Sequence, residues 1–180
     1  DNYTPITIGW GYDCFDNIQN GIDVVAINSP VIVYNGEYLE NIFINKPLML
    51  IGEDKTSTII NCDSTLLKPG VEIRSNNVEI SGFTVKNANN GIGLIKSDNC
   101  IISDNIILDC IKNGISISNS DYNTISRNKI INSGNRGTMV SQSQYNTIVG
   151  NDYSGNLVGL QINYIIQTIP LSVNNLVYHN

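Results

Sequence analysis

Two pairs of side chains recur at one spacing and could carry chemistry. Asp98 and Asp121 are 23 residues apart, and so are Tyr122 and Tyr145. Two carboxylates about 5 Å apart would suit a retaining glycosidase or could share a Ca²⁺ ion, whereas Asp is also common in turns for local reasons. Paired tyrosines could hold the apolar face of a sugar, or could simply cover a turn. Either pair acts together only if the fold makes residues 23 apart into neighbours.

Other reactive groups are scarce. The one histidine, His179, cannot form a histidine triad or a multi-histidine metal site alone. Four cysteines lack any C-x-x-C spacing, so zinc is not expected. They could form disulfides or lie buried as free thiols; they are Cys14, Cys62, Cys100 and Cys110. No cofactor is expected, apart from the Ca²⁺ alternative at the two aspartates.

The composition excludes several classes of protein. Of 180 residues, 28 are Asn and 30 are Ile, and charged residues make up only 14% with a net charge of −6. Nothing here forms a polybasic surface for nucleic acid, and no apolar run reaches the length of a membrane span. Asn and β-branched Ile disfavour long helices, while the abundance of Ile, Val and Leu disfavours disorder.

A repeat supplies the element that would position these residues. Similar segments begin at Ile80, Ile102, Ile125 and Ile148, and glycines at 91, 114, 137 and 159 run in phase with them. Each repeat contains alternating apolar residues, which predict short strands with one buried face. Repeats of this size bury their apolar face only by stacking. We therefore expect an all-β parallel β-helix whose rungs hold about 23 residues and whose isoleucines form an inward column.

Stacking at this period predicts specific neighbours in successive rungs. One turn should carry a ladder of asparagines whose amides bond up and down the stack, made of Asn105, Asn128, Asn151 and Asn180. Exposed ion pairs are expected between Asp104 and Arg127 and between Lys129 and Asp152.

The N-terminal region differs from the repeats. Apolar residues at helical spacing predict a short capping helix over 15–27 with Asp13 as its N-cap, and Trp10 should pack on that helix. Strands are expected at 31–34, 41–45, 48–51, 58–61 and 71–74, with turns at 35–36 and 69–70. The expected organisation is an N-terminal segment and capping helix over 1–30 and one continuous β-helix over 31–180.

The N-terminal residues also carry a resemblance to a known family. Gly9-Trp10-Gly11-Tyr12, Phe15 to Ile22, Val31 to Asn41 and Asn45 to Asp54 resemble the opening of pectin-lyase-like repeat proteins, above all the NosD-like, carbohydrate-binding and sugar-hydrolase type found on archaeal cell surfaces. The resemblance implies a right-handed, single-stranded parallel β-helix outside the cell. It leaves activity open, because that superfamily holds lyases, hydrolases and purely structural surface proteins. NosD is associated with copper-site maturation, but His179, Met49 and Met139 do not make a copper site.

Two further features bear on partners. The fifth repeat arrives late, after an apolar insertion that could form a partner contact or fold back as a C-terminal plug; its candidate contact residues are Ile165, Ile166, Ile169 and Leu171. Asn2 opens an N-x-T sequon and is the candidate glycosylation site.

The sequence therefore favours a non-enzymatic structural or adhesive protein of an archaeal cell surface. We expect it to associate with other surface proteins or head to tail with itself, and head-to-tail contacts that do not close give filaments. The rival is a carbohydrate-binding or polysaccharide-cleaving module, with Tyr122 and Tyr145 as the platform and Asp98 and Asp121 as the acids.

Overall fold

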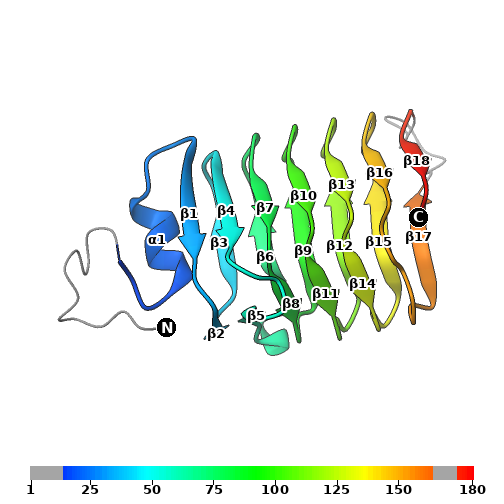
Figure 1. Ribbon diagram of the computed structural model, residues 1–180. Helices are drawn as coiled ribbons and strands as arrows, with labels where there is room; N and C mark the ends of the chain where they lie inside the picture. The colour runs from blue at the N-terminus through cyan, green and yellow to red at the C-terminus, as the bar shows by residue number, and fades with distance from the viewer. Residues whose placement is uncertain (1–13, 164–173) are drawn as a thin grey trace.

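The protein is a right-handed parallel β-helix of about six turns with one short helix at its N-terminal end (Figure 1). The computed structural model describes residues 14–163 and 174–180. Most turns contribute one strand to each of three parallel sheets, and strands that follow one another in the chain lie in different sheets. Between β16 and β17 the second sheet has only an isolated bridge, from Lys129 to Asp152.

The strands of each sheet are hydrogen-bonded in order along the axis. The first sheet contains β1 (Ser29–Val33), β4 (Leu48–Gly52), β7 (Glu79–Ser81), β10 (Ile101–Ser103), β13 (Thr124–Ser126), β16 (Thr147–Val149) and β18 (Leu176–Tyr178). The second contains β2 (Gly36–Leu39), β5 (Thr58–Asn61), β8 (Thr84–Lys86), β11 (Ile106–Leu108) and β14 (Lys129–Ile131). The third contains β3 (Ile42–Ile44), β6 (Pro69–Ile73), β9 (Asn90–Ile95), β12 (Asn113–Ser118), β15 (Arg136–Ser141) and β17 (Val158–Asn163).

The core is a set of aliphatic columns that run along the axis. In the first sheet Ile102 pairs with Ile80 on one side and with Ile125 on the other, and Ile125 pairs in turn with Ile148. These four isoleucines are fully buried. The stacking of residues 22 or 23 positions apart, which the repeat predicted, is therefore confirmed.

The predicted capping helix is present but shorter than expected. Helix α1 spans Ile18–Val24, and its N-cap is Asn17, whose side chain accepts a hydrogen bond from Asn20 N. Asp13, the expected N-cap, lies outside the described residues. The helix ends early because Val25 is already extended, and its two buried residues, Ile18 and Ile22, cover the N-terminal end of the core.

Side chains from the first rungs clamp both ends of α1. The Glu40 carboxylate accepts from Ile18 N at 2.8 Å and Gln19 N at 3.0 Å, which satisfies N–H groups that a helix start leaves unpaired. Lys46 donates to the backbone oxygens of Asp23 and Val25 at the other end. These contacts fix the cap on the solenoid.

The cap also protects a strand edge. Strand β3 is the last strand of its sheet, and an open edge invites pairing with other chains. The Gln19 amide accepts from Phe43 N at 2.8 Å and donates to Phe43 O at 3.1 Å, so one side chain replaces a pairing strand there.

The first rungs depart from the sequence expectations in detail. Strand β1 begins at Ser29 rather than at residue 31. The expected turn at 35–36 is confirmed only at Asn35, which lies at the bend between β1 and β2, because Gly36 opens the unforeseen strand β2. The expected turn at 69–70 is wrong, because Pro69 opens β6. An extra element, the 3-10 helix Ser64–Leu66, lies between β5 and β6. These rungs lack the regular repeat, so no spacing argument could correct the local turn signals.

One of the two expected ion pairs forms. Arg127 contacts Asp104 at 2.6 Å, and this guanidinium holds the pKa of the Asp104 carboxyl below its usual range. Lys129 and Asp152 form no direct ion pair, although the charge of Lys129 contributes, after the hydrogen bonds from Ser154, to the lowered pKa of Asp152. Their backbones form an isolated bridge, but the Asp152 carboxylate accepts from Ser154 N at 2.9 Å instead.

Candidate functional site

The predicted acids and tyrosines, Asp98, Asp121, Tyr122 and Tyr145, gather at one corner of the β-helix, between the third sheet and the first. We call this the D–Y corner; it comprises residues 97–100, 120–123 and 143–146, which follow β9, β12 and β15. Equivalent positions of the three turns form columns parallel to the axis, because the strands on either side are in register. The residues of one column are therefore described together.

Asp98 and Asp121 are neighbours in one of these columns, and each is used to hold the next rung. Asp98 Oδ1 accepts from Asp121 N at 2.7 Å, and Asp121 Oδ1 accepts from Gln144 N at 2.7 Å. In the previous rung the neutral Asn76 does the same for Asp98 N at 2.8 Å. Since an amide serves as well as a carboxylate, this position needs an acceptor oxygen and not an acid.

Tyr122 and Tyr145 stack on each other at the outer edge of the corner. Their ring centroids are 4.9 Å apart and the rings are within 6° of parallel. Each ring therefore covers one face of the other, and the outer faces and edges are left to solvent, with the residues 57% and 46% exposed. A sugar would have to stack on an outer face of the pair rather than lie across both rings.

The two tyrosines occupy strained backbone positions. Their φ angles are 58° and 56°, in the left-handed region that bulky residues rarely enter. Other rungs fill the same position with asparagine, which tolerates this region best after glycine, namely with Asn77, Asn99 and Asn174. Placing tyrosine there costs about 1–2 kcal/mol per residue, and stacking returns about 0.5–1.5 kcal/mol for the pair.

The structure joins Asn105, Asn128, Asn151 and Asn180 in a continuous ladder at the turn between the first and second sheets. Each asparagine accepts, through Oδ1, both the backbone N–H and the side-chain N–H of the asparagine one rung earlier, at 3.0–3.2 Å. Phe83 stands in the ladder position one rung before Asn105, and its backbone N–H donates to Asn105 Oδ1 at 3.1 Å. The ladder satisfies buried polar groups that would otherwise destabilise the interior.

Two ladders that were not predicted lie at the D–Y corner. Asn123 N donates to Asn146 Oδ1 at 2.8 Å, and Asn146 N donates to Asn175 Oδ1 at 2.9 Å. Beside them Ser97 N donates to Ser120 Oγ and Ser120 N donates to Ser143 Oγ, both at 3.0 Å. The signal was present, since Asn123, Asn146 and Asn175 have the same 23- and 29-residue spacings as the end of the first ladder.

Three cysteines are buried free thiols rather than disulfide partners. Cys62 follows β5, whereas Cys100 precedes β10 and Cys110 follows β11 in a later rung. Burial raises the pKa of Cys62 and Cys110 to about 12 and that of Cys100 to about 11. Their side chains remain protonated at neutral pH, which makes them unreactive.

This burial predicts the reactivity of the thiols. In a Cys14→Ser variant, the three remaining cysteines should react slowly with a disulfide reagent at pH 8 and quickly after unfolding in guanidinium. Raising the pH from 7 to 9 should increase the reaction rate of the thiols far more in the unfolded chain than in the folded protein, because only the thiols of the unfolded chain titrate in that window. Rapid labelling of the folded protein, followed by absorbance, would contradict the burial.

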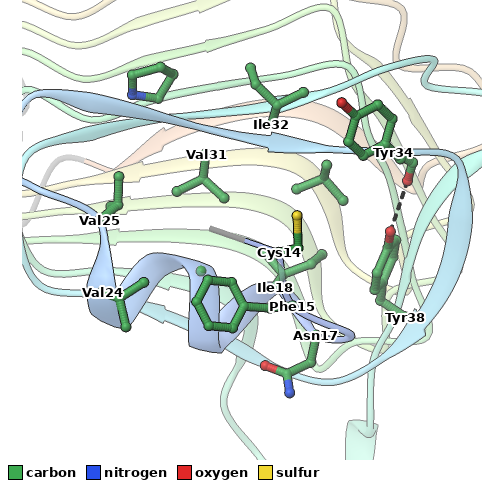
Figure 2. Close-up of a pocket in the computed structure, with 13 residues that line it drawn as sticks. Cys14, Phe15, Asn17, Ile18, Val24, Val25, Val31, Ile32, Tyr34 and Tyr38 are labelled. Carbon is green, nitrogen blue, oxygen red and sulfur yellow. Dashed lines mark hydrogen bonds between the residues drawn. The ribbon is translucent and has the colours of Figure 1, made fainter. Parts of the chain in front are cut away.

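An apolar pocket lies at the opposite end of the molecule from β18. It has a volume of about 410 Å³ and lies between α1 and β1. Figure 2 shows Phe15, Val24 and Val25 on the helix side and Val31 and Ile32 on the strand side. Tyr38 donates its hydroxyl to Tyr34 O at 2.9 Å at one end of the pocket. None of the described residues that line it is charged.

Comparison with known proteins places the chain in a family. The family model described as "Periplasmic copper-binding protein (NosD)" matches residues 11–180. The chain belongs to the NosD family. A "Cell surface glycoprotein" of Methanothermus fervidus is 38% identical over 95 residues, which cover 52% of this chain and 16% of that protein. The chain thus spans a small part of the length of that relative.

Solved structures share the fold of this NosD-family chain at low sequence identity. An alginate lyase from Paenibacillus sp. str. FPU-7 superposes with a TM-score of 0.68 at 15% identity, over 79% of this chain and 54% of that one. Pectin methylesterase PemA from Erwinia chrysanthemi superposes with a TM-score of 0.60 at 15% identity, over 75% and 51% of the two chains. These similarities establish the β-helix fold alone.

The residues described here do not fit the copper that the NosD family name implies. Met49 lies on β4 and Met139 on β15, in different sheets, and His179 packs edge-on against Tyr178 at 5.4 Å in the last rung. Soft sulfur and imidazole ligands must converge to hold copper. Within residues 14–163 and 174–180, no three His, Cys, Asp or Glu side chains group into a metal site.

Several predicted site residues fall in parts of the chain that the structure does not describe, and the membrane expectation rests on the length of the helices. Asn2 and the insertion residues Ile165, Ile166, Ile169 and Leu171 lie outside the described residues. In the part of the chain that is described, α1 is far too short to cross a bilayer, and no other helix reaches that length.

Proposed function

We propose that this chain is a non-catalytic structural segment of an extracellular, cell-surface β-helix protein. The observation that carries the proposal is the use of Asp98 and Asp121. These two acids are paired closely at the corner, and one carboxylate oxygen of each accepts a hydrogen bond from a backbone N–H of the next rung. The neutral Asn76 side chain accepts the same bond one rung earlier. Polar side chains across the corner serve the cohesion of the rod along its axis.

The family and its relatives support the location and the structural role. NosD is described as periplasmic, and the archaeal relative is named a cell surface glycoprotein. Ladders of asparagine and serine side chains join successive rungs at two corners of the β-helix. Such a stack suits a rigid rod on a cell surface. The solved neighbours include enzymes that act on polysaccharides, so catalysis is the alternative that needs a direct test.

The test replaces the two acids by the amide found one rung earlier. An Asp98→Asn/Asp121→Asn variant should keep the melting temperature of the wild type within a few degrees, since each amide oxygen can accept the same hydrogen bond. Neither protein should depolymerise or de-esterify alginate or pectin. Turnover by the wild type that disappears in the folded variant would overturn the structural role.

End-to-end association is the second part of the proposal. Val177 continues the inward isoleucine column, yet it is 40% exposed, and Leu176 and Tyr178 beside it on β18 are also exposed. Because α1 covers the other end, such a contact would join unlike surfaces, and unlike surfaces build open chains. Sedimentation velocity should show assemblies that grow with concentration and disappear in Val177→Lys. A monomer at every concentration would refute this part.

Carbohydrate binding at Tyr122 and Tyr145 is the second candidate function. The observation that favours it is the backbone strain at both tyrosines, since strain retained at an exposed site points to a role beyond folding. The matched variant is Tyr122→Asn/Tyr145→Asn, which restores the residue used elsewhere in the column. It should fold at least as stably as the wild type. Loss of glycan-array signals in this variant would support binding, and an array without signals for the wild type would exclude it.

A further inference from the structure

Each tyrosine of the D–Y corner has a carboxylate beside it that comes from the rung before. Asp98 Oδ1 accepts from Asp121 N, and Asp121 is followed directly by Tyr122. Asp121 Oδ1 accepts in the same way from Gln144 N, and Gln144 is followed directly by Tyr145. Both hydrogen bonds measure 2.7 Å. The two carboxylates are thereby fixed one residue away from the aromatic pair.

The rung without a tyrosine receives the same bond from an amide. Asn76 Oδ1 accepts from Asp98 N, and the residue that follows Asp98 is Asn99. An amide oxygen thus makes this bond between rungs as a carboxylate does, so the bond itself gives no reason for an acid. Because the acids coincide with the tyrosines, their charge is better explained by a role at the aromatic pair.

Both carboxylates keep one oxygen that the next rung does not use. Asp98 and Asp121 are partly exposed, and each bonds the next rung through Oδ1 alone. Asp121 is the only charged residue in 119–123 and 142–146, and the neighbouring strands β10, β12, β13 and β16 contain none. Lys96, two residues before Asp98, is the nearest basic residue along the chain. The corner therefore carries more negative than positive charge.

This arrangement suits a sugar that has hydroxyl groups and no acid. The outer face of a tyrosine ring can pack against the C–H face of a pyranose. A carboxylate oxygen accepts hydrogen bonds from sugar hydroxyls, and such bonds are stronger than those to neutral acceptors. A uronate instead brings a carboxylate of its own, which donates no hydrogen bond and is repelled by the two acids.

We propose that the D–Y corner selects uncharged sugars and rejects uronates. Tyr122 and Tyr145 form the platform, and the second oxygens of Asp98 and Asp121 accept hydrogen bonds from the sugar hydroxyls. The two acids then serve both the bond between rungs and the ligand. This inference rests on carbohydrate binding at the two tyrosines, the second candidate function proposed above.

A glycan array with matched pairs tests this selectivity. It carries glucose and galactose oligomers beside the corresponding oligouronates, and oligogalacturonate with free and with methyl-esterified carboxyl groups. The wild type should bind the uncharged member of a pair about fivefold more strongly, which is the effect of two like charges about 8 Å away in water. The preference should shrink in 1 M salt, where charges are screened beyond about 3 Å. Tyr122→Asn/Tyr145→Asn should bind neither member.

Asp98→Asn/Asp121→Asn is the matched variant, because the amide keeps the bond between rungs and removes both charges. It should bind the two members of a pair about equally. Equal, tyrosine-dependent binding of both members by the wild type would overturn the inference and leave carbohydrate binding intact, and so would a preference that the amide variant retains. An array without signals for the wild type, or with signals that survive in Tyr122→Asn/Tyr145→Asn, would remove carbohydrate binding at the tyrosines and this inference with it.

Discussion

Replacing Gly114 by alanine is expected to destabilise the β-helix by about 1–3 kcal/mol, the range for overpacking a close-packed core. A Cβ at Gly114 would lie 2.2 Å from Ile130 Cγ2 and 2.8 Å from the backbone oxygen of Gly137. The inward isoleucine of the second sheet fills the space that a side chain would need, and the carbonyl of the next rung closes the other side. Urea or guanidinium unfolding, with the midpoint and slope compared to the wild type, measures the loss.

The same steric pattern explains the glycine period. A Cβ at Gly91 or Gly137 would meet Ile107 or Tyr153, respectively, at 2.4 Å. Gly150→Asn is the matched control, because a Cβ there would meet nothing closer than 3.9 Å, and Arg127 and His179 hold the same left-handed position in adjacent rungs. We expect Gly150→Asn to leave the midpoint nearly unchanged. If Gly114→Ala also left the midpoint unchanged, that result would contradict the close packing of Ile130 and Gly137 around Gly114.

Replacing Asn128 by alanine is expected to lower the free energy of unfolding by about 2–4 kcal/mol. Asn128 is buried, and its Oδ1 is the acceptor for the backbone N–H of Asn105, while its Nδ2 donates to Ile102 O at 2.8 Å. A buried N–H left without an acceptor costs about 1–3 kcal/mol, and the loss of the other bonds and of packed volume adds to it. Chemical denaturation again provides the measurement.

Asn135→Ala is the control for the ladder. Asn135 is exposed on the same turn of the solenoid and has an ordinary negative φ, so its side chain can be removed without backbone strain. We expect its unfolding free energy to stay within about 0.5 kcal/mol of the wild type. Equal stability of Asn128→Ala and Asn135→Ala would mean that the ladder contributes nothing to cohesion.

The repeats could be predicted because periodicity and stacking leave little freedom. Once Ile80, Ile102 and Ile125 are placed on one inward column, every residue at the same offset follows, including the Asn105–Asn128 pair and the stacked tyrosines. The first rungs could not be predicted in this way. Gly36 was taken for a turn because its local sequence resembles one, whereas pairing with β5 makes it the start of a strand.

The candidate site shows where spacing arguments end. Spacing placed Asp98 beside Asp121, but it could not tell whether their oxygens face a substrate or the next backbone N–H. The left-handed backbone conformation of Tyr122 could not be predicted either, because tyrosine, unlike glycine or asparagine, does not favour that conformation. The pocket beside β1 depends on how α1 packs on the first rung. The spacing of apolar residues in a seven-residue helix does not predict that packing, so the pocket could not be predicted.

Methyl NOE spectroscopy on isoleucine-labelled protein tests the stacked winding most directly. Neighbouring strands in a sheet are about 4.8 Å apart, so the account predicts cross-peaks from Ile102 to Ile125 and from Ile125 to Ile148, and none from Ile102 to Ile148. Absence of the first two cross-peaks from a well-resolved spectrum of the folded protein would contradict it.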